Sequence, residues 1–271
     1  MQLKTILNRM IAPLGYNTVK LLLTLGGKRG AYAQDGLVSV HNHDFMRDPK
    51  FETAYARGVQ AAAGDDYQWH WRVHVGLWAA AHAIRVPGDF VECGVNRGCL
   101  ASAIMKYLDW NSRERTFYLL DTFQGLDERY VSAMEKKRGT LALNAERLKG
   151  GEYVAGVESV RQNFSDWRNV QIVVGAIPET LEQVPSRSIA YLHLDMNCAP
   201  PEIAAANHFW DRLSPGAVLL LDDYAYLGYE PQKTAMDEFA RARGVQILSL
   251  PTGQGLLIKP IGANSVMKTE Q

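Results

Sequence analysis

The chain has 271 residues, 47% of them hydrophobic and 21% charged, which is enough for one large α/β domain or two small ones. Lys plus Arg and Asp plus Glu each total 29, so the formal net charge is zero, which argues against nucleic acid as a partner. The three cysteines, Cys93, Cys99 and Cys198, are too few for a disulfide framework and indicate a cytoplasmic protein.

Residues 1–86 have a helical and loop-like pattern. Their basic, amphipathic start is interrupted by Pro13 and Lys20, and it never reaches the ~20 apolar residues that span a bilayer. We therefore expect no integral membrane association, although the basic flank would also suit a peripheral membrane helix. The segment is expected to form a helical extension or lid that contacts the substrate or the second copy in a homodimer.

From residue 87 onward, short β-rich runs alternate with helical patterns. The runs IAYLHL and AVLLL are apolar on both faces, which is typical of central parallel strands covered by helices. The alternation predicts an α/β fold over residues 87–262, with a Rossmann-like, doubly wound, mostly parallel seven-stranded sheet and a tail over 263–271. No helical pattern separates the last two runs, so we expect an antiparallel C-terminal edge hairpin. Strands are predicted over 89–93, 116–120, 171–174, 189–194, 217–221, 245–248 and 256–259, and helices over 98–109, 157–167, 200–213 and 231–243.

Ligands of open α/β sheets bind at the carboxyl ends of the strands, so the polar residues at those ends are the first candidates for a site. In the run FVECGVNRGCL, the strand ends at Glu92 and Cys93, Gly94 makes the turn and Gly98 opens a helix. The spacing lacks the G-x-G-x-x-G of dinucleotide sites, and Glu92 would repel a diphosphate but attract a cationic amine. The alternative is a tight strand-to-helix turn with a solvated Glu.

The next two strand ends suggest contacts to a nucleoside. Asp121 ends the neighbouring strand, where a carboxylate can accept both hydroxyl protons of a ribose, although Asp-Thr is also a common turn cap. The third strand ends at Gly175 and Ala176, which would leave room for a flat base against the backbone. Ordinary loop packing is the alternative there.

The fourth and fifth strand ends bring three carboxylates together. Asp195 follows one strand, and Asp222 with Asp223 follows the next. Three such groups repel one another, and a divalent cation with a preference for oxygen ligands, Mg²⁺, would resolve the conflict. In the alternative, one carboxylate caps a helix and another pairs with a basic residue such as Arg97. Arg72 could also hold a carboxylate.

Two further residue types have ordinary structural explanations. His193 lies inside an apolar strand and is expected to be a hydrogen-bonded core residue. Cys93 and Cys99 flank the glycine loop, but no arrangement of His and Asp around them indicates a nucleophile, so they are expected to fill space.

The runs GDFVECGVNRG, LLDTFQGL, LHLDMN and LSPGAVLLLDDY resemble the macrocin O-methyltransferase (TylF/MycF) family over residues 87–259. These are class I S-adenosylmethionine-dependent enzymes that methylate sugar hydroxyls, often with Mg²⁺. The resemblance implies that the glycine loop holds the amino-acid part of the cofactor, Asp121 the ribose, Thr122 and Phe123 the adenosine, and residues 175–177 the adenine. The implied cofactor-binding residues are Glu92, Cys93, Gly94, Arg97, Gly98, Asp121, Thr122, Phe123, Gly175, Ala176, Ile177 and Asp195. The implied metal ligands are Asp195, Asp222 and Asp223, and the implied catalytic positions are Asp195 and Asn197.

One departure from the family pattern concerns the catalytic base. The family has Asp-x-Asp where this chain has Asp195-Met196-Asn197, and an amide takes up no proton at neutral pH. Either metal activation suffices, or another base acts, or the acceptor is not a sugar hydroxyl. We predict an S-adenosylmethionine-dependent O-methyltransferase, Mg²⁺-assisted, acting on a glycosylated or polyhydroxylated small molecule. The alternatives are an NAD-dependent oxidoreductase on a Rossmann sheet and a non-catalytic S-adenosylmethionine-binding protein.

Overall fold

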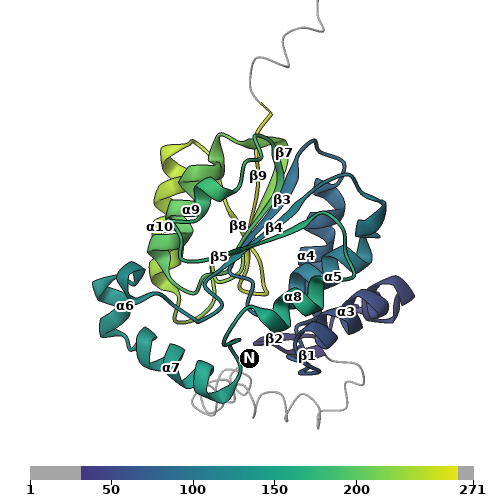
Figure 1. The fold of residues 1–271 in the computed structure, drawn as a ribbon, viewed down its shortest axis with the longest axis horizontal. Helices are drawn as coiled ribbons and strands as arrows, with labels where there is room; N and C mark the ends of the chain where they lie inside the picture. The colour runs from purple at the N-terminus through teal and green to yellow at the C-terminus, as the bar shows by residue number, and fades with distance from the viewer. Residues whose placement is uncertain (1–31, 262–271) are drawn as a thin grey trace, which may run out of the picture.

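A seven-stranded sheet forms the centre of the computed structural model, which describes residues 32–261 (Figure 1). The strand order is β5-β4-β3-β6-β7-β9-β8; the first five strands in this order are parallel, and β9 runs antiparallel to β7 and β8. This confirms the predicted Rossmann-like sheet with its antiparallel edge hairpin. The strands are β3 (Asp89–Cys93), β4 (Phe117–Asp121), β5 (Val170–Val174), β6 (Ile189–Leu194), β7 (Leu213–Leu221), β8 (Leu248–Ser249) and β9 (Gly255–Ile258).

Helices cover both faces of the sheet (Figure 1). The helix pair α9 (Ala199–Trp210) and α10 (Glu230–Ala242) covers one face, and α4 (His70–Ala83) with α5 (Cys99–Tyr107) covers the other. Alternate residues of β7 enter different cores: Val218 and Leu220 pack on the α4 and α5 side, whereas Leu219 and Leu221 pack on the α9 and α10 side. Burial on both faces explains why this strand is a continuous apolar run. The remaining helices are α3 (Pro49–Ala61), α6 (Ala133–Lys137), α7 (Thr140–Gly150) and α8 (Glu158–Phe164), with short 3-10 helices at η2 (Asp44–Arg47), η3 (Trp110–Ser112), η4 (Glu128–Tyr130) and η5 (Leu181–Gln183).

The predicted strand over 245–248 begins later than expected. Val245 donates its backbone N–H to the carbonyl of Ala240, 3.1 Å away, so it belongs to the turn that ends α10. Strand β8 is therefore only two residues long, and its Leu248 is 59% exposed. A short edge strand of this kind leaves few backbone groups open to pairing with another sheet.

A two-stranded hairpin, β1 (Tyr32–Gln34) and β2 (Leu37–Ser39), precedes the helices and was not predicted. Its turn is Asp35-Gly36, with φ of 47° and 71°, which is the Asp-Gly signal of a tight hairpin. The expected N-terminal helix within residues 1–30 and the tail over 263–271 lie outside the described residues. Between residues 32 and 261, no helix is both long and apolar enough to span a membrane.

Candidate functional site

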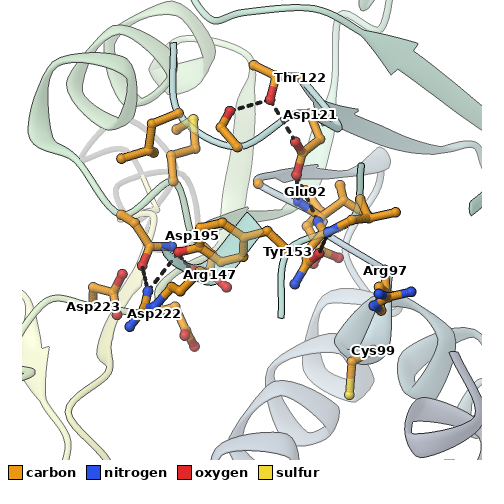
Figure 2. Close-up of a pocket in the computed structure, with 18 of the residues that line it drawn as sticks. Glu92, Arg97, Cys99, Asp121, Thr122, Arg147, Tyr153, Asp195, Asp222 and Asp223 are labelled. Carbon is orange, nitrogen blue, oxygen red and sulfur yellow. Dashed lines mark hydrogen bonds between the residues drawn. The ribbon is translucent and has the colours of Figure 1, made fainter. Parts of the chain in front are cut away.

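A cavity of about 650 Å³ opens at the carboxyl ends of the parallel strands, as expected for an open α/β sheet (Figure 2). Its size is typical of a site for a small molecule or cofactor. In Figure 2 the three carboxylates Asp195, Asp222 and Asp223 gather at one end, away from Arg97. The predicted residues that line the cavity are Glu92, Gly94, Arg97, Asp121, Thr122, Phe123, Gly175, Ala176, Ile177, Asp195, Asn197, Asp222 and Asp223. Cys93, which is fully buried, and Gly98 are not among the lining residues.

The glycine loop brings the ends of β3 and β6 into contact. Gly94 has a φ of +87°, and a Cβ built on it would lie 1.8 Å from the backbone oxygen of Asp195. The backbone N–H of Asp195 in turn donates to the carbonyl of Cys93 at 2.9 Å. Only a residue without a side chain permits this approach, so Gly94 places the loop directly against the backbone of Asp195.

Asp121 braces the same loop. Its Oδ2 accepts the backbone N–H groups of Val95 at 2.6 Å and Asn96 at 2.8 Å, and its Oδ1 accepts that of Phe123 at 2.7 Å. A carboxylate has about four lone-pair positions, and the fourth on Asp121 faces the hydroxyl of Thr122 at 3.4 Å. That hydroxyl has one proton and lies closer, at 2.5 Å, to the carbonyl of Gly125, so the fourth position is open to a ligand when Thr122 donates to Gly125. Its first role is therefore to fix the loop, and it retains capacity for one ligand hydroxyl.

Glu92 lines the cavity and has a buried oxygen without a hydrogen-bond partner. The side chain is 2% exposed, its Oε1 lies 3.4 Å from Nδ1 of His193, and its buried Oε2 has no hydrogen-bond partner. Burial raises the pKa of Glu92, and the neighbouring His193 opposes that rise. A buried carboxylate oxygen without a donor is costly, so this atom favours a ligand that carries an N–H cation.

His193 is buried between two carboxylates. Its Nδ1 faces Glu92 at 3.4 Å and its Nε2 faces Oδ1 of Asp222 at 3.8 Å, both longer than ordinary hydrogen bonds. Burial lowers the pKa of His193, but the two carboxylates outweigh it and raise the pKa to about 10. The two carboxylates therefore favour the imidazolium form of His193, which its place in an apolar strand did not indicate.

Asp222 is held by a buried guanidinium. Nη1 of Arg72 donates to Oδ2 of Asp222, and Nε2 of Gln254 donates to its Oδ1 at 3.0 Å. Burial opposes the charged form, yet Arg72 and His193 hold the pKa of Asp222 below its ordinary value. A basic residue therefore does pair with one of the three carboxylates, but it is Arg72; Arg97 instead donates to the carbonyl of Gly151 at 2.9 Å.

Asn197 connects Asp195 to the opposite wall. Its Nδ2 donates to Oδ1 of Asp195 at 3.2 Å, and its Oδ1 accepts Tyr229 Oη at 2.9 Å and Arg147 Nη1 at 3.3 Å. Burial, together with the charges of Asp222 and Asp223, raises the pKa of Asp195. The amide thus orients Asp195 where the family pattern has a second acid.

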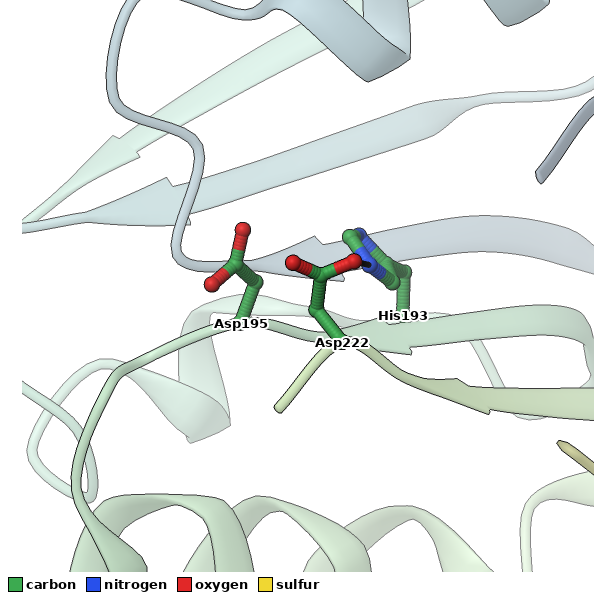
Figure 3. Close-up of side chains that lie close together, drawn as sticks. All are labelled: His193, Asp195 and Asp222. Atoms are coloured by element: carbon green, nitrogen blue, oxygen red, sulfur yellow. Dashed lines mark ion pairs between the residues drawn. The ribbon is translucent and has the colours of Figure 1, made fainter. Parts of the chain in front are cut away.

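The candidate metal ligands differ from the predicted set. Within the described part of the chain, His193, Asp195 and Asp222 are the three whose ligand atoms all lie within 4.8 Å of one another. Figure 3 shows Asp222 between the other two. Asp223, which was predicted, is not in this group; its buried Oδ2 has no hydrogen-bond partner.

Several residues of the site were missed from the sequence. Asp35 accepts Nε of Arg72 at 3.1 Å, and Arg147 donates to Tyr153 Oη at 2.7 Å. Gln254 could have been found from the sheet register, because Leu221 pairs with Gly255 and so places Gln254 beside Asp222. Asp35, Arg147 and Tyr153 carry no motif that marks them.

Comparisons with known proteins show the family and the fold of the chain. The model of the family macrocin-O-methyltransferase (TylF) matches residues 77–248. Demethyldecarbamoylnovobiocin O-methyltransferase from Streptomyces niveus is 28% identical over 169 residues, which is 57% of this chain and 58% of that protein. Mycinamicin III 3''-O-methyltransferase from Micromonospora griseorubida is 29% identical over 146 residues, which is 51% of this chain and 56% of that protein. The chain thus spans a little over half the length of these relatives. The structure of the O-methyltransferase NovP shares the fold, with a TM-score of 0.62 at 22% identity over 76% of this chain and 88% of that one.

Proposed function

The chain belongs to the macrocin-O-methyltransferase family, and from this premise we propose that it methylates a hydroxyl of a sugar or polyhydroxylated small molecule, with S-adenosylmethionine as methyl donor. The relatives named above are O-methyltransferases. The observation that carries the proposal is the buried, unpaired Oε2 of Glu92 at the wall of the cavity. An NAD-dependent oxidoreductase is disfavoured, because this carboxylate would repel a diphosphate.

The residues around the cavity fit this cofactor. S-adenosylmethionine supplies a methyl group on a positively charged sulfur, and it also carries an ammonium group. Glu92 would accept from the ammonium, and the free acceptor position of Asp121 would take one ribose hydroxyl. Gly175 and Ala176 would border the base at the end of β5. Each of these roles matches a group that the cavity otherwise leaves unpaired or open.

The acceptor hydroxyl must lose its proton as its oxygen is methylated. Asp195 lines the cavity, and Asn197 donates to only one of its oxygens, Oδ1. The other oxygen is available to the hydroxyl, and the raised pKa of Asp195 makes it a stronger base than an exposed aspartate. We therefore assign the proton transfer to Asp195 and the positioning of Asp195 to Asn197.

A divalent cation fits this site poorly. Magnesium held by Asp195, Asp222 and Asp223 would lie against the guanidinium of Arg72, which already donates to Oδ2 of Asp222, while Gln254 donates to its Oδ1. The two cations would repel each other at the same carboxylate. Both nitrogens of His193 face carboxylates, so each is placed to donate an N–H to its neighbour rather than to bind a metal. No step of the proposed reaction is therefore assigned to a metal.

A calorimetric titration with S-adenosylhomocysteine tests the proposal. The wild-type protein should bind it with micromolar affinity, and Glu92→Gln should bind at least tenfold more weakly because the amide cannot neutralise an ammonium. Glu158→Gln, an exposed change in α8, is the matched control and should bind like wild type. Transfer of a labelled methyl group to a panel of sugars and glycosides follows. Absence of S-adenosylhomocysteine binding by the wild type would refute the proposed function.

A further inference from the structure

Arg72 is the most firmly held cation in the cavity wall. Arg72 lies in α4 and is 6% exposed, and all three of its guanidinium nitrogens donate hydrogen bonds. Nε and Nη2 donate to the two oxygens of Asp35 at 3.1 and 3.4 Å, and Nη1 donates to Asp222. The guanidinium carbon also lies 5.2 Å from the ring centroid of Trp69 and 5.0 Å from that of Tyr226. Two carboxylates and two aromatic rings thus fix its orientation.

Arg72 places a positive charge next to the carboxylates of Asp222 and Asp195. Asp222 and Asp195 have oxygens within 4.8 Å of each other, and Arg72 binds the first of these carboxylates directly. An arginine in a protein does not deprotonate, so it is a permanent positive charge. A guanidinium has five N–H donors, and three are used by the bonds to Asp35 and Asp222. Two N–H groups remain on a side chain that lines the cavity.

We propose that Arg72 is the fixed cation of this active site and takes the place of a divalent metal. Asp35 and Asp222 hold the guanidinium so that a free N–H donates to the acceptor oxygen. There it stabilises the negative charge that develops as Asp195 removes the proton. This inference rests on the proposed methyl transfer, and it adds that the reaction proceeds without a bound metal.

Binding of Mn²⁺, measured by electron paramagnetic resonance, tests the inference before the methyl acceptor is identified. The wild-type protein should leave the signal of free Mn²⁺ unchanged up to millimolar concentrations. Arg72→Gln removes the cation but leaves the carboxylates, so it should bind Mn²⁺ at least tenfold more tightly than wild type. Arg97→Gln makes the same charge change in the same cavity, but Arg97 does not bind Asp222. Its affinity for Mn²⁺ should therefore equal that of the wild type.

Two results would overturn the inference. One is tight Mn²⁺ binding by the wild type that Asp195→Asn abolishes. The other is a folded Arg72→Gln protein, which still binds S-adenosylhomocysteine, that gains no affinity for Mn²⁺. If Arg72→Gln fails to fold, the titration of the wild-type protein with Mn²⁺ still tests whether the site binds a metal. Failure of S-adenosylhomocysteine binding would count against the proposed function, whereas metal binding alone would count only against the role of Arg72.

Once an acceptor is known, chemical rescue gives a second readout. Arg72→Ala should lose about 100-fold or more in kcat, as expected when a charge-stabilising donor is removed. Added guanidinium should restore part of the rate. A purely structural role of Arg72 predicts no rescue by guanidinium.

Discussion

Replacing Gly94 by alanine tests how closely the glycine loop approaches the end of β6. The added Cβ would lie 1.8 Å from the backbone oxygen of Asp195, whereas real Cβ atoms essentially never come within 3.0 Å of another heavy atom. The two strand ends must therefore separate by at least 1.2 Å, the difference between these distances. The contact is with backbone, so no side chain can rotate away to relieve it.

The expected destabilisation has two parts. A non-glycine residue at a left-handed φ costs about 1–2 kcal/mol. Forcing extra volume into a packed contact adds about 1–3 kcal/mol. We therefore expect Gly94→Ala to lower the free energy of unfolding by about 2–5 kcal/mol in all, a large share of the ~5–15 kcal/mol typical of a folded domain. Affinity for S-adenosylhomocysteine should fall at least tenfold, because the loop that borders Glu92 is displaced.

Gly64→Ala is the control. Gly64 has a φ of +91°, and its Cβ would meet nothing within 4 Å, so it carries the backbone cost without the collision. Urea denaturation of both variants separates the two parts, and calorimetry reports the affinity for S-adenosylhomocysteine. If Gly94→Ala is no less stable than Gly64→Ala, the close approach of β3 and β6 at this point is wrong.

Three further predictions concern the charged groups of the site. The folded-state pKa of His193 is raised from 6.5 to about 10, so its stabilisation is complete below about pH 6.5 and is lost as the pH rises through 10. Thermal melts should show this loss in the wild type but not in His193→Gln; parallel curves would contradict it. Asp222→Asn removes one of the two buried carboxylate partners of Arg72 and should cost about 3–5 kcal/mol in urea denaturation. A loss below about 1 kcal/mol, the range of surface pairs, would mean that the pair is solvated. Asp121→Asn places an N–H donor against backbone N–H groups and should weaken S-adenosylhomocysteine binding at least tenfold by calorimetry. Asp127→Asn, also at the cavity but outside the loop, should not.

The sequence predicted those parts of the site that sheet topology brings together. Glu92, Asp195 and Asp222 each follow a buried parallel strand, and the ends of parallel strands meet at one edge of the sheet. Arg72 was expected to hold a carboxylate, but the same reasoning could not assign it to Asp222, because Arg72 is 150 residues away in the chain and reaches it through the packing of α4 on the sheet. Tertiary contacts of this kind leave no periodic pattern.

The sequence also carries a local signal for the turn of the first hairpin. The Asp35-Gly36 pair is typical of a hairpin turn, yet the helical and loop-like pattern of residues 1–86 led to a prediction of helices and loops there. At position 197 the sequence showed that an acid is missing but not what the amide does instead. Its contacts to Arg147 and Tyr229 depend on where α7 and the start of α10 lie beside the cavity, and the sequence did not predict these positions.

The bond between Asp35 and Arg72 has a consequence for the construction of chimeric enzymes. The sequence pattern changes near Pro87, which suggests a crossover point there for chimeras that exchange acceptor specificity between relatives. A sheet joined there to a foreign N-terminal part would lose both the guanidinium that binds Asp222 and the hairpin carboxylate that orients it. A crossover placed before Tyr32 would transfer hairpin, helix α4 and sheet as one electrostatic unit.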